Sequence, residues 1–288
     1  MKISRVLLAT KTTLMDVGRS MHATQPLKRL LDAGDPLVAD EEPGHRKTVE
    51  TISVVKRTLE QAGIEVTHAR RRNNVSKKFD LVIAVGGDGT VLDIARFIRN
   101  TPLLAVNSSP STSFGHFCAT TSEGFPSLLE LVLSDRKQPA SLTRAFVTID
   151  GRRHPQPALN DVLFANVVPS ATSRYVITVA GVSETHKSSG VWISTAAGST
   201  GAMLSAGGSI QDLQDTRLQY LVREPFGCRP DSIRYRLVSG MLGDEGIVLQ
   251  SRMIRSGVYL DGRRTAVPVD FGSRITVTPD GPPLLLFR

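Results

Sequence analysis

The sequence contains only two cysteines, Cys118 and Cys228, and no Cys-x-x-Cys pair. So few thiols exclude a disulfide-stapled scaffold and any metal site built from cysteines alone. A zinc site is also disfavoured, because no pair of histidines has the spacing of metal ligands. The histidines concerned are His22, His45, His68, His154 and His186.

Long apolar runs are absent as well: no stretch reaches the ~18 residues that a membrane-spanning helix requires. The first apolar run, Val6–Ala9, is too short for a signal-peptide core and is followed by no small-residue cleavage pattern. We therefore interpret this run as a first buried strand. No membrane partner is expected, and a soluble protein of the cytoplasm is favoured.

The charge is moderately positive, with 35 Lys and Arg against 27 Asp and Glu, giving +8. This excess indicates an anionic ligand or partner. A nucleic-acid partner is disfavoured, because the charge is diffuse and no platform of basic and aromatic residues is present. The chain has 288 residues, of which 40% are hydrophobic and 22% charged, a composition typical of soluble globular proteins. At ~150 residues per domain, two domains are expected.

The first half of the chain alternates strand and helix signals, which predicts a parallel sheet with crossover helices. Two segments, Gln25–Gly44 and Arg70–Asn74, are expected to be disordered or mobile. The predicted strands are Val6–Ala9, Ile64–Thr67, Leu81–Val85 and Leu103–Val106. The predicted helices are Lys47–Ala62, Val91–Ile98 and Phe125–Leu133.

From about Ala140 onward the pattern changes to short β-type runs separated by Gly, Pro, Asp and Ser, which predicts an all-β domain. Asp150-Gly151 and Asp261-Gly262 are dipeptides typical of hairpin turns. We therefore predict an α/β domain with a parallel sheet over residues 1–139 and a mainly β domain over 140–288. This prediction allows the last residues of the chain to return to the first domain.

The most informative segment is Gly86-Gly87-Asp88-Gly89-Thr90, which follows the most apolar strand and precedes a helix. Glycines allow close approach of the backbone to a ligand, and a strand-to-helix turn presents free N–H groups that suit phosphate. The segment has neither the Walker lysine nor the Gly-x-Gly-x-x-Gly pattern. A carboxylate in a phosphate cradle is repulsive unless it holds a metal or takes a proton. The alternative is a structural turn in which Asp88 caps the helix.

Two further segments are candidates for binding. Residues 194–201, continuing to 208, are mostly small, hydroxylated or glycine, and offer donors without bulk to a nucleotide or pyrophosphate. Asn160 and Asp161 lie at the start of a β run, and their side chains suit hydrogen bonding to a ribose or an amide. A plain surface loop and an Asx turn are the respective alternatives.

Three segments, taken in chain order, together resemble the NAD kinase family. They are the Gly-Gly-Asp-Gly-Thr turn, the Asn-Asp pair, and the Ser-Thr…Gly-Ser-Thr loop that ends in Ser-Ala-Gly-Gly. The first of these alone is shared with lipid kinases of the diacylglycerol type and, more loosely, with phosphofructokinases. Additional segments resemble the mitochondrial-type branch of the family. These are Thr10-Lys11-Thr12-Thr13, Val106-Asn107, Gly115-His116-Phe117-Cys118, Ser188-Ser189-Gly190 and Val222-Arg223-Glu224-Pro225.

The resemblance implies a two-domain fold with its site in the cleft, and transfer of the terminal phosphoryl group of ATP, or of polyphosphate, to the 2′-hydroxyl of the adenosine ribose of NAD. It also implies a divalent cation such as Mg²⁺, and a homo-oligomer. Asp88 matches the catalytic base of the family. The family's phosphate-binding turn is matched by Gly86, Gly87, Gly89 and Thr90, and Lys11 is a further candidate for phosphate binding. The implied NAD-binding residues are Asn160, Asp161, His116, Ser189, Thr195, Gly198, Ser199, Thr200 and Ser205.

Ser189 and Ala202 depart from the bacterial pattern, which has a carboxylate and an aromatic ring at these positions. Two alternatives to an NAD kinase therefore remain at this point: a lipid kinase of the diacylglycerol type, and an NAD-binding regulator with weak catalysis. The sequence does not choose between ATP and polyphosphate, between NAD and NADH, or between a dimer and a tetramer.

Overall fold

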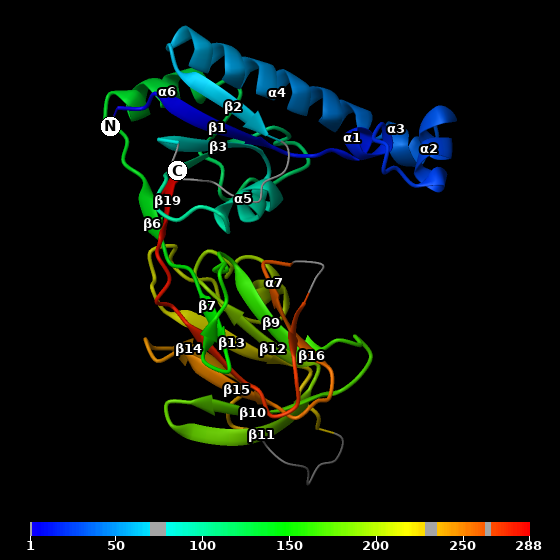
Figure 1. The fold of residues 1–288 in the computed structure, drawn as a ribbon, viewed down its shortest axis with the longest axis vertical. Helices are drawn as coiled ribbons and strands as arrows, with labels where there is room; N and C mark the ends of the chain where they lie inside the picture. The colour runs from blue at the N-terminus through cyan, green and yellow to red at the C-terminus, as the bar shows by residue number, and fades with distance from the viewer. Residues whose placement is uncertain (1, 70–78, 228–234, 263–265) are drawn as a thin grey trace. The chain divides into compact units, whose positions relative to one another are not determined.

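The computed structural model describes residues 2–69, 79–227, 235–262 and 266–288. It divides into two compact units, of which unit 1 comprises Met1–Ala140 with Leu285–Arg288, and unit 2 comprises Ser141–Leu284. Unit 1 is an α/β domain with a parallel sheet and unit 2 is all-β and antiparallel, so the predicted fold class is confirmed (Figure 1). The segment Arg70–Asn74, which was predicted to be mobile, lies outside the described residues.

The sheet of unit 1 has the strand order β2-β1-β3-β4-β19-β6, with β5 beside β4. The pairs β2–β1, β1–β3, β3–β4 and β4–β19 are parallel. All six residues of β3 are buried, as expected of a strand covered on both faces. The strands are β1 (Arg5–Thr10), β2 (Glu65–Ala69), β3 (Leu81–Gly86), β4 (Leu103–Asn107), β5 (Thr120–Thr121), β6 (Ala140–Leu142) and β19 (Leu284–Phe287).

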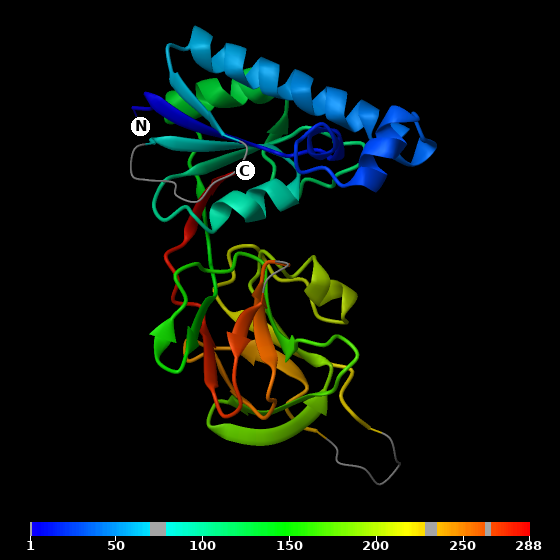
Figure 2. The ribbon, with the colours of Figure 1, turned by 45° about the vertical axis from the view of Figure 1, so that its right-hand side comes forward.

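Helices cover both faces of this sheet. Helices α4 (Glu42–Gln61) and α6 (Phe125–Leu133) lie on one face and α5 (Asp88–Ala95) lies on the other (Figures 1 and 2). Val55 of α4 and Leu129 of α6 share one hydrophobic core with alternate residues of the strands. This alternation follows from the two-residue period of a strand, which sends successive side chains to opposite faces.

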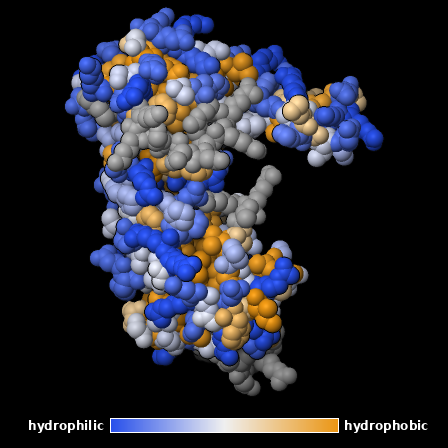
Figure 3. Space-filling model, in the orientation of Figure 1, coloured by the Kyte–Doolittle hydropathy of each residue, from blue (hydrophilic) through white to orange (hydrophobic). Residues whose placement is uncertain are grey.

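The prediction of disorder for Gln25–Gly44 is wrong, because the segment forms helices. Asp35 caps one of them, its carboxylate accepting a hydrogen bond from the N–H of Leu37 at 2.9 Å. A Cβ placed on Gly18 would lie 2.0 Å from Leu31 Cδ1, so the first two helices pack closely. In Figure 3, apolar side chains stand among hydrophilic ones over this part of unit 1. The helices of this segment are α2 (Gln25–Asp32), α3 (Pro36–Ala39) and the first turn of α4, and α1 (Leu14–Gly18) precedes them.

Unit 2 consists of two six-stranded antiparallel sheets, with the orders β11-β10-β15-β18-β7-β8 and β14-β13-β12-β9-β16-β17. Buried residues of both sheets, such as Phe164 and Tyr175, form one hydrophobic core, as in sandwiches of two sheets. The strands are β7 (Phe146–Ile149), β8 (Arg152–Arg153), β9 (Asp161–Asn166), β10 (Ser173–Val179), β11 (Val182–Ser188), β12 (Gly190–Ser194), β13 (Leu218–Arg223), β14 (Ser239–Leu242), β15 (Ile247–Ser251), β16 (Ser256–Leu260), β17 (Val267–Val269) and β18 (Arg274–Thr278). A short helix, α7 (Ala202–Ser205), follows β12.

The turn predicted at Asp150-Gly151 is confirmed: it joins the paired strands β7 and β8, with φ of 48° and 78°. Asp261 and Gly262 directly follow β16, also with positive φ. Across the parts of the chain that the structure describes, no helix combines the length and hydropathy needed to cross a bilayer.

Candidate active site

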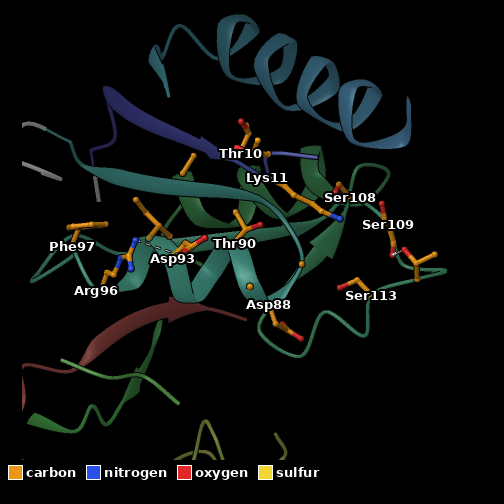
Figure 4. A pocket seen from close by; sticks show the side chains of 16 residues that line it. Thr10, Lys11, Asp88, Thr90, Asp93, Arg96, Phe97, Ser108, Ser109 and Ser113 are labelled. Atoms are coloured by element: carbon orange, nitrogen blue, oxygen red, sulfur yellow. Dashed lines mark hydrogen bonds and ion pairs between the residues drawn. The ribbon is translucent and has the colours of Figure 1, made fainter. Parts of the chain in front are cut away.

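Three neighbouring parallel strands, β1, β3 and β4, end at one edge of the sheet in unit 1. A cavity of about 760 Å³ lies at this edge (Figure 4). Its lining includes the residues that follow the three strands, among them Lys11, Asp88 and Ser109. Ligands of open α/β sheets bind at the carboxyl ends of the strands, so the cavity is the candidate site.

The glycine-rich turn after β3 forms one wall of the cavity. A Cβ placed on Gly86 would lie 2.2 Å from Thr90 Oγ1, and the φ of Gly86 is 158°. A Cβ on Gly87 would lie 2.2 Å from Ser113 Oγ, so a side chain there would require the Ser113 hydroxyl to turn away. Gly89 differs, because a Cβ there would meet no heavy atom within 4 Å. Gly89 lines the cavity, and the space beside its Cα is therefore open.

Asp88 is half-buried and begins α5. Its Oδ2 accepts a hydrogen bond from the N–H of His116 at 2.9 Å, and its Oδ1 accepts one from the N–H of Phe117 at 2.8 Å. The N-cap of α5 is Gly87, and no side chain caps this helix. Asp88 is thus not a helix cap; two backbone N–H groups fix the orientation of its carboxylate at the cavity.

The charged groups of the cavity are two cations, Lys11 and Arg96, and two carboxylates, Asp88 and Asp93. Arg96 Nη2 lies 3.6 Å from Asp93 Oδ1, so these two side chains pair. Lys11 is exposed, and in the described part of the chain it forms no ion pair. Its N–H donates to the carbonyl of Val85 at 2.9 Å, which extends β1 to the cavity edge. Lys11 is therefore the cation available to an anionic ligand.

A divalent cation fits this cavity only together with a ligand that carries oxygen atoms of its own. Within the described ranges, no group of three or more His, Cys, Asp or Glu residues is placed to hold a metal. Mg²⁺ is commonly held by one or two carboxylates together with the phosphates of a substrate. The carboxylates that line the cavity are Asp88 and Asp93.

A second cluster of predicted residues lies in unit 2, where β9 begins and β12 ends. The N–H of Thr195 donates to the carbonyl of Asn160 at 2.9 Å, and the N–H of Gly198 donates to the carbonyl of Thr195 at 3.1 Å. Ser199 Oγ donates to the carbonyl of Ala196 at 2.8 Å, which closes the loop. Asn160 Oδ1 is buried and has no partner among the described residues, so an acceptor remains for a ligand.

Asp261 organises this cluster, and the sequence marked it only as a turn residue. Its carboxylate accepts hydrogen bonds from the N–H groups of Leu159 at 3.0 Å, Asn160 at 2.8 Å and Asp161 at 3.3 Å. These donors lie 100 to 102 residues away along the chain. The one local signal was an Asp-Gly pair directly after a β run, which identifies the turn but not the donors.

Asp161 is buried next to this charged neighbour. Burial, and to a smaller extent the negative charge of Asp261, together raise the pKa of its carboxyl from 3.8 to about 7. Asp261 keeps the charge of the pair, because three backbone N–H groups donate to it. Asp161 is therefore the carboxyl that takes a proton.

We expect Asp161 to make the protein less stable as the pH rises. The folded-state pKa is the higher one, so the stabilising contribution is complete below pH ~4 and is lost as the pH passes through ~7. Asp161→Asn, which cannot ionise, should reduce this dependence. Urea unfolding of both proteins at about pH 5 and about pH 8 measures it. If the free energy of unfolding decreased equally in both proteins between these two pH values, the raised pKa could not be assigned to Asp161.

The relatives of the chain can be stated once this geometry is known. A family model described as the ATP-NAD kinase N-terminal domain matches residues 19–136. A probable NADH kinase of Oryza sativa subsp. japonica is 33% identical over 258 residues, which cover 81% of this chain and 79% of the relative. The chain belongs to the NAD kinase family. An NADH kinase of Arabidopsis thaliana is 35% identical over 242 residues, or 75% of this chain and 76% of the relative.

Solved structures of NAD kinases share the fold. An NAD kinase from Archaeoglobus fulgidus in complex with ATP superposes with a TM-score of 0.70 at 21% identity, covering 99% of this chain and 93% of that one. Yeast NADH kinase complexed with NADH superposes with a TM-score of 0.69 at 16% identity, covering 96% of this chain and 78% of that one. The family resemblance expected from the sequence is confirmed, and the lipid-kinase alternative is not favoured.

Other positions that the NAD kinase resemblance singled out lie apart from the Asn160 cluster or on the surface. Ser189 stands at the opposite end of β12 from Thr195, and its N–H donates to the carbonyl of Arg223 at 2.9 Å. Thr200 is exposed, as is Ser205, whose Oγ donates to the carbonyl of Gly201 at 3.4 Å. The roles of these three residues in NAD binding stay predictions.

Proposed function

We propose that the protein transfers the terminal phosphoryl group of ATP to the 2′-hydroxyl of the adenosine ribose of NAD, giving NADP and ADP. The observation that carries this proposal is the orientation of the Asp88 carboxylate, which two backbone N–H groups fix. Asp88 lines a cavity together with the glycine-rich turn and Lys11. Membership of the NAD kinase family supports the same reaction.

Asp88 acts as the general base. As the 2′-oxygen bonds to the terminal phosphorus, the bond from that phosphorus to the departing ADP oxygen breaks, and the hydroxyl proton passes to the carboxylate. A ribose hydroxyl is a weak nucleophile, and a positioned base typically contributes ~10²–10⁴-fold to such a step. The N–H groups of His116 and Phe117 keep the carboxylate in place for this transfer.

The glycine-rich turn and Lys11 hold the donor. Phosphoryl transfer depends mainly on positioning and on neutralisation of charge. Gly87, Gly89 and Thr90 line the cavity together with Lys11. Mg²⁺, when bound with the donor, neutralises part of the phosphate charge. One of the solved relatives is in complex with ATP, so we propose ATP as the donor and compare polyphosphate with it.

In this proposal the dinucleotide is bound by the cluster in unit 2, which consists of Asn160, Asp161, Thr195, Gly198 and Ser199. The unpaired Oδ1 of Asn160 accepts a hydrogen bond from it, and Asp161 contacts its ribose hydroxyls. The ring of His116 packs against the adenine. NADH is included as an acceptor, because the two plant relatives are named NADH kinases. The homo-oligomer and the cytoplasmic location stay predictions.

The purified protein, incubated with ATP, Mg²⁺ and NAD, should form NADP, which glucose-6-phosphate dehydrogenase detects. Parallel incubations with NADH, with polyphosphate and with diacylglycerol compare the acceptors and donors. Phosphorylation of diacylglycerol in place of NAD would contradict the proposal. Tight NAD binding without any NADP would favour the regulator.

We expect Gly89→Ala to fold as the wild type does but to bind the donor poorly. A methyl group at this position meets no protein atom within 4 Å, and Ala is a better helix former than Gly. The methyl group would occupy the space into which the donor phosphates fit. We expect kcat/KM for ATP to fall roughly tenfold with an unchanged or higher Tm. An unchanged kcat/KM would place the phosphates elsewhere.

A further inference from the structure

Ser109, one of the residues that line the cavity, carries a buried hydroxyl without a partner. Ser109 is only 6% exposed, and its Oγ has no hydrogen-bond partner among the residues that the structure describes. Buried polar groups in folded proteins are nearly always paired, so an orphan of this kind requires an explanation. The adjacent Ser108 is also buried, but its Oγ lies 3.1 Å from Thr48 Oγ1 and is paired.

The backbone around Ser109 is fixed on both sides. Its N–H donates to Asn107 Oδ1 at 3.0 Å, and Asn107 Nδ2 donates to the carbonyl of Ser113, also at 3.0 Å. The carbonyl of Ser109 accepts from the N–H groups of Thr112 at 3.1 Å and Ser113 at 2.8 Å. Only the hydroxyl of Ser109 is therefore left to bond with a ligand, and it stands on a rigid frame.

The neighbouring groups indicate the chemistry of that ligand. The side chain of Lys11 extends along the cavity toward Ser108 and Ser109 (Figure 4). Because Ser109 Oγ is buried, its bond to a ligand in the cavity requires the side chain to turn to another staggered rotamer. A hydroxyl donor and an ammonium together suit an anion with several acceptor oxygens, and phosphate is such an anion.

We propose that Ser109 and Lys11 together bind a phosphate group of the donor's phosphoanhydride chain, which makes Ser109 a determinant of donor affinity. ATP and inorganic polyphosphate share this chemistry. The inference rests on the proposed function for the identity of the donor. Binding of a phosphate chain is nevertheless measurable without the acceptor and without turnover.

Calorimetric titration of the wild type and Ser109→Ala with ATP and with tripolyphosphate, each with Mg²⁺ and without NAD, tests this proposal. Loss of one hydrogen bond to a charged group should raise the Kd for both probes about tenfold. The Kd for NAD should not change. The Tm should not fall, because the substitution removes an unpaired hydroxyl. Weakening with ATP alone would contradict the proposal, because the contact would then be to the nucleoside.

Ser108→Ala is the matched control, because it removes a neighbouring buried hydroxyl that is paired with Thr48. We expect it to lower the Tm and to leave the Kd for both phosphate chains unchanged. An unchanged Kd in Ser109→Ala, or an equal loss of NAD affinity, would overturn the proposal. If the wild type forms no NADP but Ser109→Ala still weakens tripolyphosphate binding, the proposed function fails and this inference stands.

Discussion

Asp88→Asn is expected to lower kcat by about 10²–10⁴-fold and to leave the KM for NAD nearly unchanged. Asparagine keeps the size of the side chain and can still accept a hydrogen bond through its amide oxygen. It cannot take the proton of the 2′-hydroxyl as a carboxylate does. Steady-state kinetics with NAD and ATP separate kcat from KM, and thermal unfolding shows whether the loop held by the N–H groups of His116 and Phe117 is retained.

Asp93→Asn is the matched control for this substitution. Asp93 lines the same cavity and begins with the same charge, but it is 79% exposed and pairs with Arg96 at 3.6 Å. Exposed ion pairs contribute little to stability, so kcat should stay close to that of the wild type. Loss of turnover in Asp93→Asn with full turnover in Asp88→Asn would assign the base to the other carboxylate.

Gly198→Ala is expected to reduce kcat/KM for NAD by about 10²-fold. A Cβ on Gly198 would lie 2.1 Å from the carbonyl oxygen of Asn160 and 2.5 Å from its carbonyl carbon. These are backbone atoms, so the loop and Asn160 must move apart. Overpacking of this kind typically costs about 1–3 kcal/mol of stability. The kcat/KM for ATP measured with saturating NAD should change much less.

Gly201→Ala in the same loop is the control for the effect of adding a methyl group. A Cβ there would lie 3.4 Å from the carbonyl oxygen of Gly198, which is ordinary contact. We expect a smaller loss of stability and of NAD affinity than in Gly198→Ala. Equal effects of the two substitutions would mean that the close contact with Asn160 is not what shapes the NAD-binding cluster.

The sequence predicted the core of the fold well, because the strands of the parallel sheet are short, continuous apolar runs such as Leu81–Val85. It failed over Gln25–Gly44, where Asp, Pro and Gly were interpreted as signs of disorder. Asp35 is instead a helix cap, and Gly18 provides the space into which Leu31 packs. Composition alone does not distinguish a mobile segment from a succession of short capped helices.

The candidate site was predictable where its residues are contiguous in the sequence. The turn around Asp88 is local, and its glycines and carboxylate are recognisable together. Asp261 and Ser109 were missed for the opposite reason. The partners of Asp261 are about a hundred residues away, and Ser109 is distinguished by the absence of a partner. Neither property is visible in a sequence pattern.

The most direct test of the proposed reaction is to locate the new phosphate on the product. Phosphorus–proton correlation NMR of NAD incubated with the protein, ATP and Mg²⁺ should show a phosphomonoester coupled to the H2′ proton of the adenosine ribose. The same signal should be nearly absent with Asp88→Asn. Coupling to H3′ or to no ribose proton, or equal product with Asp88→Asn, would contradict phosphorylation of the 2′-hydroxyl with Asp88 as the base.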